Sequence, residues 1–155
     1  MPEPNDTRLM PHNIDAERAI LGSILLDGKA IFYAGENLTA EDFYLEGHRI
    51  IFRRMLDLVE HDHPIDTVLL RSELMRHGEE EKSGGVSYLM GLTDGLPRAA
   101  NVEAYARVVK DKATARRVIQ ISAEATERCF AGEDLPADVL EAEQSQLLDL
   151  YSRQS

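Results

Sequence analysis

The sequence predicts an all-α fold, in which a small globular helical bundle is followed by a long antiparallel helical hairpin. Apolar residues recur at intervals of three and four along most of the chain, which is the period of a helix buried on one side. No convincing run alternates apolar and polar residues, as a half-buried strand would. Residues 101–130 contain neither glycine nor proline, so a helix about 45 Å long can form there.

The composition allows one domain with a core, or a small core with an appended helical element. The chain has 155 residues, of which 43% are hydrophobic. Its net charge of -11 opposes binding to a polyanion such as DNA. The chain has no apolar run of membrane-spanning length and no signal peptide, so we expect a soluble, cytoplasmic protein. The single cysteine, Cys129, excludes an internal disulfide, and we expect it on a helix face.

The head is expected to occupy residues 13–98, after a mobile, proline-containing tail at residues 1–12. Asn13 can cap the first helix, because its side-chain oxygen can accept a hydrogen bond from a free backbone N–H. The apolar stripe of this helix is expected to continue as far as Ala30. It also contains Ala16, Ala19, Ile20, Ser23 and Ile24.

A second helix is expected to begin at Thr39, with the carboxylate of Asp42 returning a hydrogen bond to the backbone N–H of the cap. Phe43 and Tyr44 should then pack inward. The helix that follows, from about Glu46 to Glu60, has a broad apolar face and should lie at the centre of the core.

Two more helices complete the predicted head. One begins at Asp66 and ends at Gly78, where glycine can take the left-handed conformation of a C-cap. A short helix opens at Gly84 and Gly85 and ends near Gly95 and Pro97.

Residues 99–155 are expected to form the hairpin, leading to a linker, with its turn at Gly132 and Pro136. The middle of the long helix is densely charged, which suits an extended arm better than a core helix. We therefore predict that the hairpin packs against another copy or a partner; the alternative is that it folds back on the head. The predicted self-association interface consists of Val109, Ile119, Leu140, Leu147 and Leu150.

Motifs for catalysis or nucleotide binding are not found in the sequence. It has no Gly-x-x-x-x-Gly-Lys-Ser/Thr loop and no Gly-x-Gly-x-x-Gly turn. Nearly every carboxylate is expected at a cap, a loop or a polar face, and His48 at a helix surface or core edge. His61, Asp62 and His63 cluster tightly but lack further ligands at a recognisable spacing. We predict no catalytic, cofactor or metal site, with a hydrolase using His61 and His63 as the enzyme alternative.

Nucleic-acid binding is the other alternative. A basic cluster is interleaved with acidic residues and has no aromatic platform, so we expect an ion-pair surface there rather than a DNA path. The cluster consists of Arg107, Lys110, Lys112, Arg116 and Arg117. A helical DNA-binding regulator with a helix-turn-helix at 66–95 would need a basic recognition helix, but Arg71 and Arg76 are outnumbered by acidic neighbours.

Several short strings resemble the N-terminal part of the bacterial replicative hexameric helicases of the DnaB family. They stand in family order and at family spacing over most of residues 11–110. The strings are PHNIDAE (11–17), AILGSILLD (19–27), DFY (42–44) with HRIIF (48–52), PID (64–66), GG (84–85) with YL (88–89), and AANVEAYA (99–106). The string EAEQ at 141–144 is also similar.

The resemblance implies a helical head and a hairpin whose copies pair into dimers, three of which form a ring-shaped collar in the hexamer. It also implies docking of primase, and possible partners in a helicase loader or initiator. The family's ATPase domain lies outside this sequence. ATP-dependent 5′ to 3′ unwinding, the binding of ATP and Mg²⁺, and most contacts with DNA would belong to that domain of the parent protein.

Overall fold

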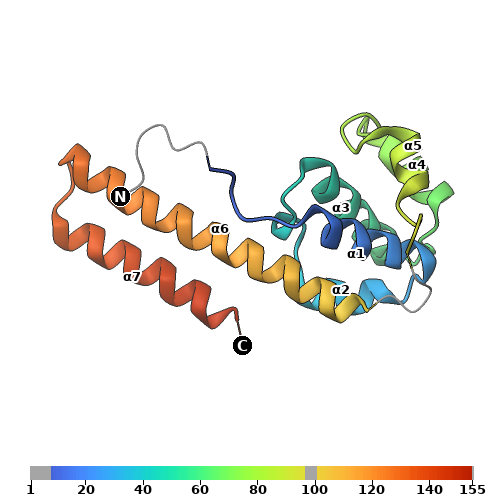
Figure 1. The fold of residues 1–155 in the computed structure, drawn as a ribbon. Helices are drawn as coiled ribbons and strands as arrows, with labels where there is room; N and C mark the ends of the chain where they lie inside the picture. The colour runs from blue at the N-terminus through green and yellow to red at the C-terminus, as the bar shows by residue number, and fades with distance from the viewer. Residues whose placement is uncertain (1–7, 97–100, 155) are drawn as a thin grey trace. The chain divides into compact units, whose positions relative to one another are not determined.

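The computed structural model describes residues 8–96 and 101–154, and within these ranges all regular structure is helical (Figure 1). The predicted all-α class is confirmed. The elements in chain order are α1 (Ile14–Leu26), α2 (Ala30–Asn37), the 3₁₀ helix η1 (Ala40–Asp42), α3 (Glu46–Glu60), α4 (Thr67–Arg76), α5 (Gly85–Gly91), α6 (Val102–Ala131) and α7 (Pro136–Ser152). The short helix expected to end near Gly95 ends at Gly91 instead. The expectations for residues 1–7, for Pro97 and for the matching Ala99 and Ala100 lie outside the described residues. No helix in the described ranges is long and apolar enough to cross a membrane.

The chain divides into two units, and the division falls inside α6. His12–Asp111 forms one unit, here called the head, and Met1–Pro11 with Lys112–Ser155 forms the other, here called the hairpin unit. The sequence places this boundary near residue 98 instead. The difference arises because the first turns of α6 contribute Ala106 and Val109 to the core of the head.

The core of the head is arranged around α3, as the sequence predicts. This helix packs against α1, α2, α4 and η1. Its buried residues lie on one broad face, because positions three and four apart share a side of the helix. They are His48, Ile50, Ile51, Phe52, Met55 and Leu58. The rings of Phe43 and Phe52 lie 4.9 Å apart in this core.

Local signals fix most helix starts in the head. The side-chain oxygen of Asn13 accepts a hydrogen bond of 2.9 Å from the backbone N–H of Ala16, and Asp66 does the same for Leu69 at 2.8 Å. Gly78 follows α4 with a φ of +68°, a left-handed conformation that glycine adopts without steric cost. These three predictions are confirmed.

Two further boundaries differ from expectation. Ala30 does not extend α1: the first helix ends at Leu26, and Asp27 takes an extended conformation and accepts a hydrogen bond from the N–H of Lys29. Thr39 begins only the three-residue η1, although the expected bond from its N–H to Asp42 is present at 2.8 Å. Both cases show an Asp side chain bonding to nearby backbone, which competes with continued helix.

One glycine allows two helices of the head to approach closely. A Cβ atom placed on Gly22 would lie 2.3 Å from the carbonyl oxygen of Leu92, directly after α5. Any side chain at this position would therefore separate α1 from the end of α5.

The hairpin unit consists of the second part of α6 and the antiparallel helix α7 (Figure 1). Gly132, with a φ of +69°, ends α6, and Pro136 occupies the first turn of α7, where its missing N–H costs nothing. Ile121 and Val139 are buried between the two helices. The turn residues predicted from the sequence are confirmed.

Candidate functional site

A stripe of exposed apolar residues runs along α7. Leu147, Leu148 and Tyr151 stand 7, 8 and 11 residues after Leu140, so the four residues share one side of the helix. Their exposed fractions are 68%, 37%, 64% and 77%. An apolar stripe of this length in water is typical of a surface that binds another protein.

The opposite side of α7 faces α6 and contains few large apolar side chains. Residues from both helices line this seam: Ile121, Glu124, Ala125, Arg128, Val139, Ala142, Glu143 and Gln146. Polar contacts close both ends of the seam. Arg117 donates a hydrogen bond of 3.4 Å to Gln146, and Arg128 donates one of 2.9 Å to Asp134, which raises the pKa of the arginine. The seam therefore buries little apolar surface.

The outward side of α6 in the hairpin unit adds to the exposed apolar surface. Val118, Ile119 and Phe130 are all exposed there, and Leu135 is exposed in the turn. Ile119 and Phe130 stand 11 residues apart, which places them on the same side of α6. The hairpin unit thus directs most of its large apolar side chains into solvent.

The structure separates the five predicted interface residues into different surroundings. Ile119, Leu140 and Leu147 are exposed on the hairpin. Leu150 is half-buried and lies 11 residues after Val139, on the side of α7 that faces α6. Val109 is 1% exposed in the core of the head, so it has almost no surface to offer a second copy. The exposed stripe contains Leu148 and Tyr151 in addition to Leu140 and Leu147. Counting helical turns from Leu140 would have placed both residues on the same side of α7.

Two residues of the predicted basic cluster, Arg107 and Lys110, form ion pairs within the head. Arg107 lies 3.6 Å from Glu103 and Lys110 lies 3.4 Å from Asp42, as expected for an ion-pair surface. Arg116 differs, because it is buried and donates a hydrogen bond of 2.7 Å to the carbonyl oxygen of Pro11.

The two arginines of the helix-turn-helix alternative are also paired. Arg71 lies 3.3 Å from Glu80, and Arg76 lies 3.1 Å from Glu73. Each positive charge therefore has an acidic neighbour on the same surface, which weakens attraction to a phosphate backbone.

The head contains a buried polar network that sequence reasoning missed. Glu17 and His48 are each 1% exposed, and the Nδ1 atom of His48 lies 2.8 Å from a carboxylate oxygen of Glu17. The other carboxylate oxygen accepts a hydrogen bond of 2.7 Å from the N–H of Tyr44. The Nε2 atom of His48 contacts the hydroxyl of Tyr88, whose pKa is raised by burial. These bonds connect α1, α3 and α5.

The expectation that carboxylates lie at caps, loops and polar faces is therefore wrong for Glu17, and His48 lies deeper than a core edge. The spacing of apolar residues in α1 could have predicted that Glu17 is buried. Glu17 stands three, four and seven residues before Ile20, Leu21 and Ile24, all of which are buried. A carboxylate in such a row needs buried partners, because burial without hydrogen bonds costs several kcal/mol.

His61, Asp62 and His63 are exposed at the end of α3. The Nδ1 atom of His61 lies 2.9 Å from the carbonyl oxygen of Asp57, which is a local helix-end contact. The three side chains do not form a group with metal-binding spacing among the described residues. Cys129 is exposed on α6, as expected for a helix-face position.

The family model of the DnaB-like helicase N terminal domain matches residues 9–111. The chain belongs to this family. The replicative DNA helicase DnaB of Geobacillus stearothermophilus is 38% identical over 146 residues, which are 94% of this chain and 32% of that protein. The chain thus spans about a third of the length of the curated relative it matches.

Solved structures of the DnaB family have the same fold. The N-terminal domain of DnaB helicase from Mycobacterium tuberculosis matches with a TM-score of 0.85 and 33% identity, over 91% of this chain and 99% of that one. A second match is a DnaB-like replicative helicase, whose structure is described together with its interactions with primase. The TM-score is 0.70 and the identity 26%, over 91% of this chain and 31% of that one.

The strings that resemble the DnaB family coincide with the buried polar network. Glu17 ends the first string, His48 begins another, and Tyr88 belongs to a third. Phe43, from the DFY string, is buried in the same core. Several of the residues that carry the family resemblance in the head therefore hold its helices together.

Proposed function

We propose that this domain is the N-terminal collar of a replicative DNA helicase and that its hairpin associates with the hairpin of a second copy. The observation that carries the proposal is the exposed apolar stripe of Leu140, Leu147, Leu148 and Tyr151. A C2 dimer would bring the stripes of two copies together and remove both from water. Outward residues of α6 such as Ile119 would extend the buried area.

In the parent protein, three such dimers would form a collar above the hexameric motor. The motor would bind ATP and Mg²⁺, hydrolyse ATP and unwind DNA in the 5′ to 3′ direction, in the cytoplasm. The segment described here would break no bond and would contact DNA little. Its contribution would be to set the geometry of the ring. Support comes from its membership in the DnaB-like helicase N-terminal family and from relatives that are replicative DNA helicases.

Docking of primase is the second part of the proposal. Support comes from a structural relative at 26% identity, a DnaB-like replicative helicase that is described together with its interactions with primase. The same collar could receive a helicase loader or initiator. A stable head and a self-associating hairpin would together present a fixed surface to such partners.

The first experiment is the solution mass of this chain over a concentration series, by sedimentation or light scattering. We expect a dimer or a larger assembly that dissociates on dilution. The Leu147→Asp variant should shift the dissociation to higher concentration, because an unpaired charge would be buried in the interface.

The matched control is Val68→Asp, which places the same charge at a position of the head that is 77% exposed. It should leave the assembly unchanged. A wild-type chain that is monomeric at every concentration would contradict self-association of the isolated domain. Binding of purified primase to the chain, measured separately, tests the docking part on its own.

A further inference from the structure

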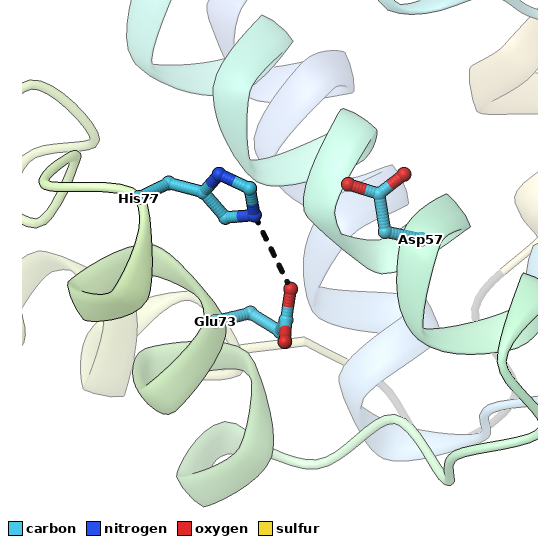
Figure 2. A group of neighbouring side chains, drawn as sticks. All are labelled: Asp57, Glu73 and His77. Atoms are coloured by element: carbon cyan, nitrogen blue, oxygen red, sulfur yellow. Dashed lines mark ion pairs between the residues drawn. The ribbon is translucent and has the colours of Figure 1, made fainter.

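Three potential metal ligands meet between α3 and α4 in the head. The side chains of Asp57, Glu73 and His77 each offer one ligand atom, and these atoms all lie within 4.8 Å of one another. Figure 2 shows Glu73 and His77 extending from α4 and its C-terminal end toward each other, with Asp57 facing them from α3. Glu73 and His77 lie 3.6 Å apart.

The fold explains why these side chains meet. Glu73 and His77 are four residues apart, so they lie on one side of the last turn of α4. Asp57 comes from the helix against which α4 packs. All three side chains are only partly buried, which leaves room for rotation and for water.

Two arginines bind these carboxylates and would compete with an ion for them. Arg76 donates to both carboxylate oxygens of Glu73, each at 3.1 Å, and its Nη2 atom lies 3.4 Å from the Nε2 atom of His77. The side chain of Arg76 is 65% exposed, so it can move into solvent when an ion binds. Arg54 donates to Asp57 at 2.6 Å and also to both carboxylate oxygens of Glu79, at 2.7 and 3.3 Å. Releasing Asp57 would therefore leave Arg54 with its two bonds to Glu79.

We propose that Asp57, Glu73 and His77 bind a divalent transition-metal ion, with Zn²⁺ as the test ion, which links α4 to α3. One imidazole nitrogen and two carboxylate oxygens suit Zn²⁺, and water would complete a tetrahedral site. Ligand atoms at about 2.1 Å from one ion lie roughly 3.4 Å apart in that geometry, so modest rotations of the side chains are required. An ion that binds only the folded head stabilises it, and the stabilisation grows with the logarithm of the ratio of ion concentration to dissociation constant.

The exposed pair His61 and His63 provides the matched control within the same chain. A surface that binds Zn²⁺ unspecifically would use these histidines as readily as His77. Specific binding should depend on Asp57, Glu73 and His77, and not on His61 or His63.

The test is calorimetric titration of the full 155-residue chain with ZnCl₂, together with thermal unfolding with and without the ion. We expect one ion per chain and a midpoint of unfolding that rises by several degrees and returns after addition of EDTA. His77→Gln and Asp57→Asn should each weaken binding about tenfold or more. His61→Gln and His63→Gln should leave the affinity unchanged.

Far-UV circular dichroism checks that His77→Gln and Asp57→Asn keep the wild-type helix content. In NMR spectra of the wild type, Zn²⁺ should shift the ring nitrogens of His77 and not those of His61 or His63. No stoichiometric binding, equal binding by His77→Gln, or loss of binding in the His61→Gln and His63→Gln controls would each overturn the proposal.

Discussion

The head and the hairpin unit bury their apolar residues in different ways. The head packs large side chains from α1, α3, α4 and α5 into one core, together with the first turns of α6. The hairpin unit buries Ile121 and Val139 between its helices but exposes larger residues such as Phe130, Leu140 and Tyr151. Two helices alone have too little inner surface to bury all their apolar residues. The head can therefore be stable within one chain, whereas the hairpin gains stability when a second surface covers it.

The largest effect is expected from truncating the centre of the head. Phe52→Ala should lower the free energy of unfolding by about 3–5 kcal/mol, because it removes buried surface and leaves a cavity. Urea unfolding followed by circular dichroism measures the change. Val68→Ala, at an exposed position, should change the free energy by no more than about 0.5 kcal/mol. A small effect of Phe52→Ala would show that the head, like the hairpin unit, lacks a tightly packed core.

The buried network provides the next largest effect. Glu17→Ala should cost about 3 kcal/mol, since it leaves His48 and the N–H of Tyr44 without their buried acceptor. The comparison is with Asp15→Ala on the exposed side of the same helix, which should cost much less. Equal losses for the two variants would mean that the network adds nothing specific to the head.

The hairpin surface should respond in assembly rather than in stability. Leu148→Asp is expected to weaken self-association by about 2 kcal/mol, or roughly 30-fold in the dissociation constant. The helix content of the monomer should not change, because Leu148 contacts solvent in the single chain. Sedimentation equilibrium measures the first quantity and circular dichroism the second. Lost helix content with unchanged assembly would reverse the roles assigned to the two units.

The smallest effect concerns a helix cap in the head. Asn13→Ala removes the acceptor of the Ala16 N–H and should cost about 1 kcal/mol. Asn13→Asp should retain nearly all the stability, because a carboxylate also accepts this bond. Thermal unfolding of the two variants separates the cap from a general effect of substitution.

Sequence reasoning succeeded where neighbouring residues contain the whole signal. Asn13 and Asp66 begin helices, Gly78 and Gly132 end them, and the period of apolar residues identifies α3 as central. It failed at Ala30, where a bond to the side chain of Asp27 competes with continuation of the helix.

The sequence predicts the exposure of the five proposed interface residues only in part. The helical period identifies an apolar position on α7, but it does not say which side of the helix a neighbour covers. Leu140 and Leu147 are exposed, whereas Leu150 lies toward α6. Val109 belongs to the head because the two units divide inside α6.

The sequence by itself determined most of the helices, several caps and turns, and the family, because these depend on residues a few positions apart or on short strings in order. Tertiary structure alone decided which polar groups share a site. Glu17, His48 and Tyr88 stand 31 and 40 residues apart along the chain, and only packing brings them into one network. The same holds for Asp57 and His77. Such contacts arise from long-range packing, which the local periodicity of a sequence does not specify.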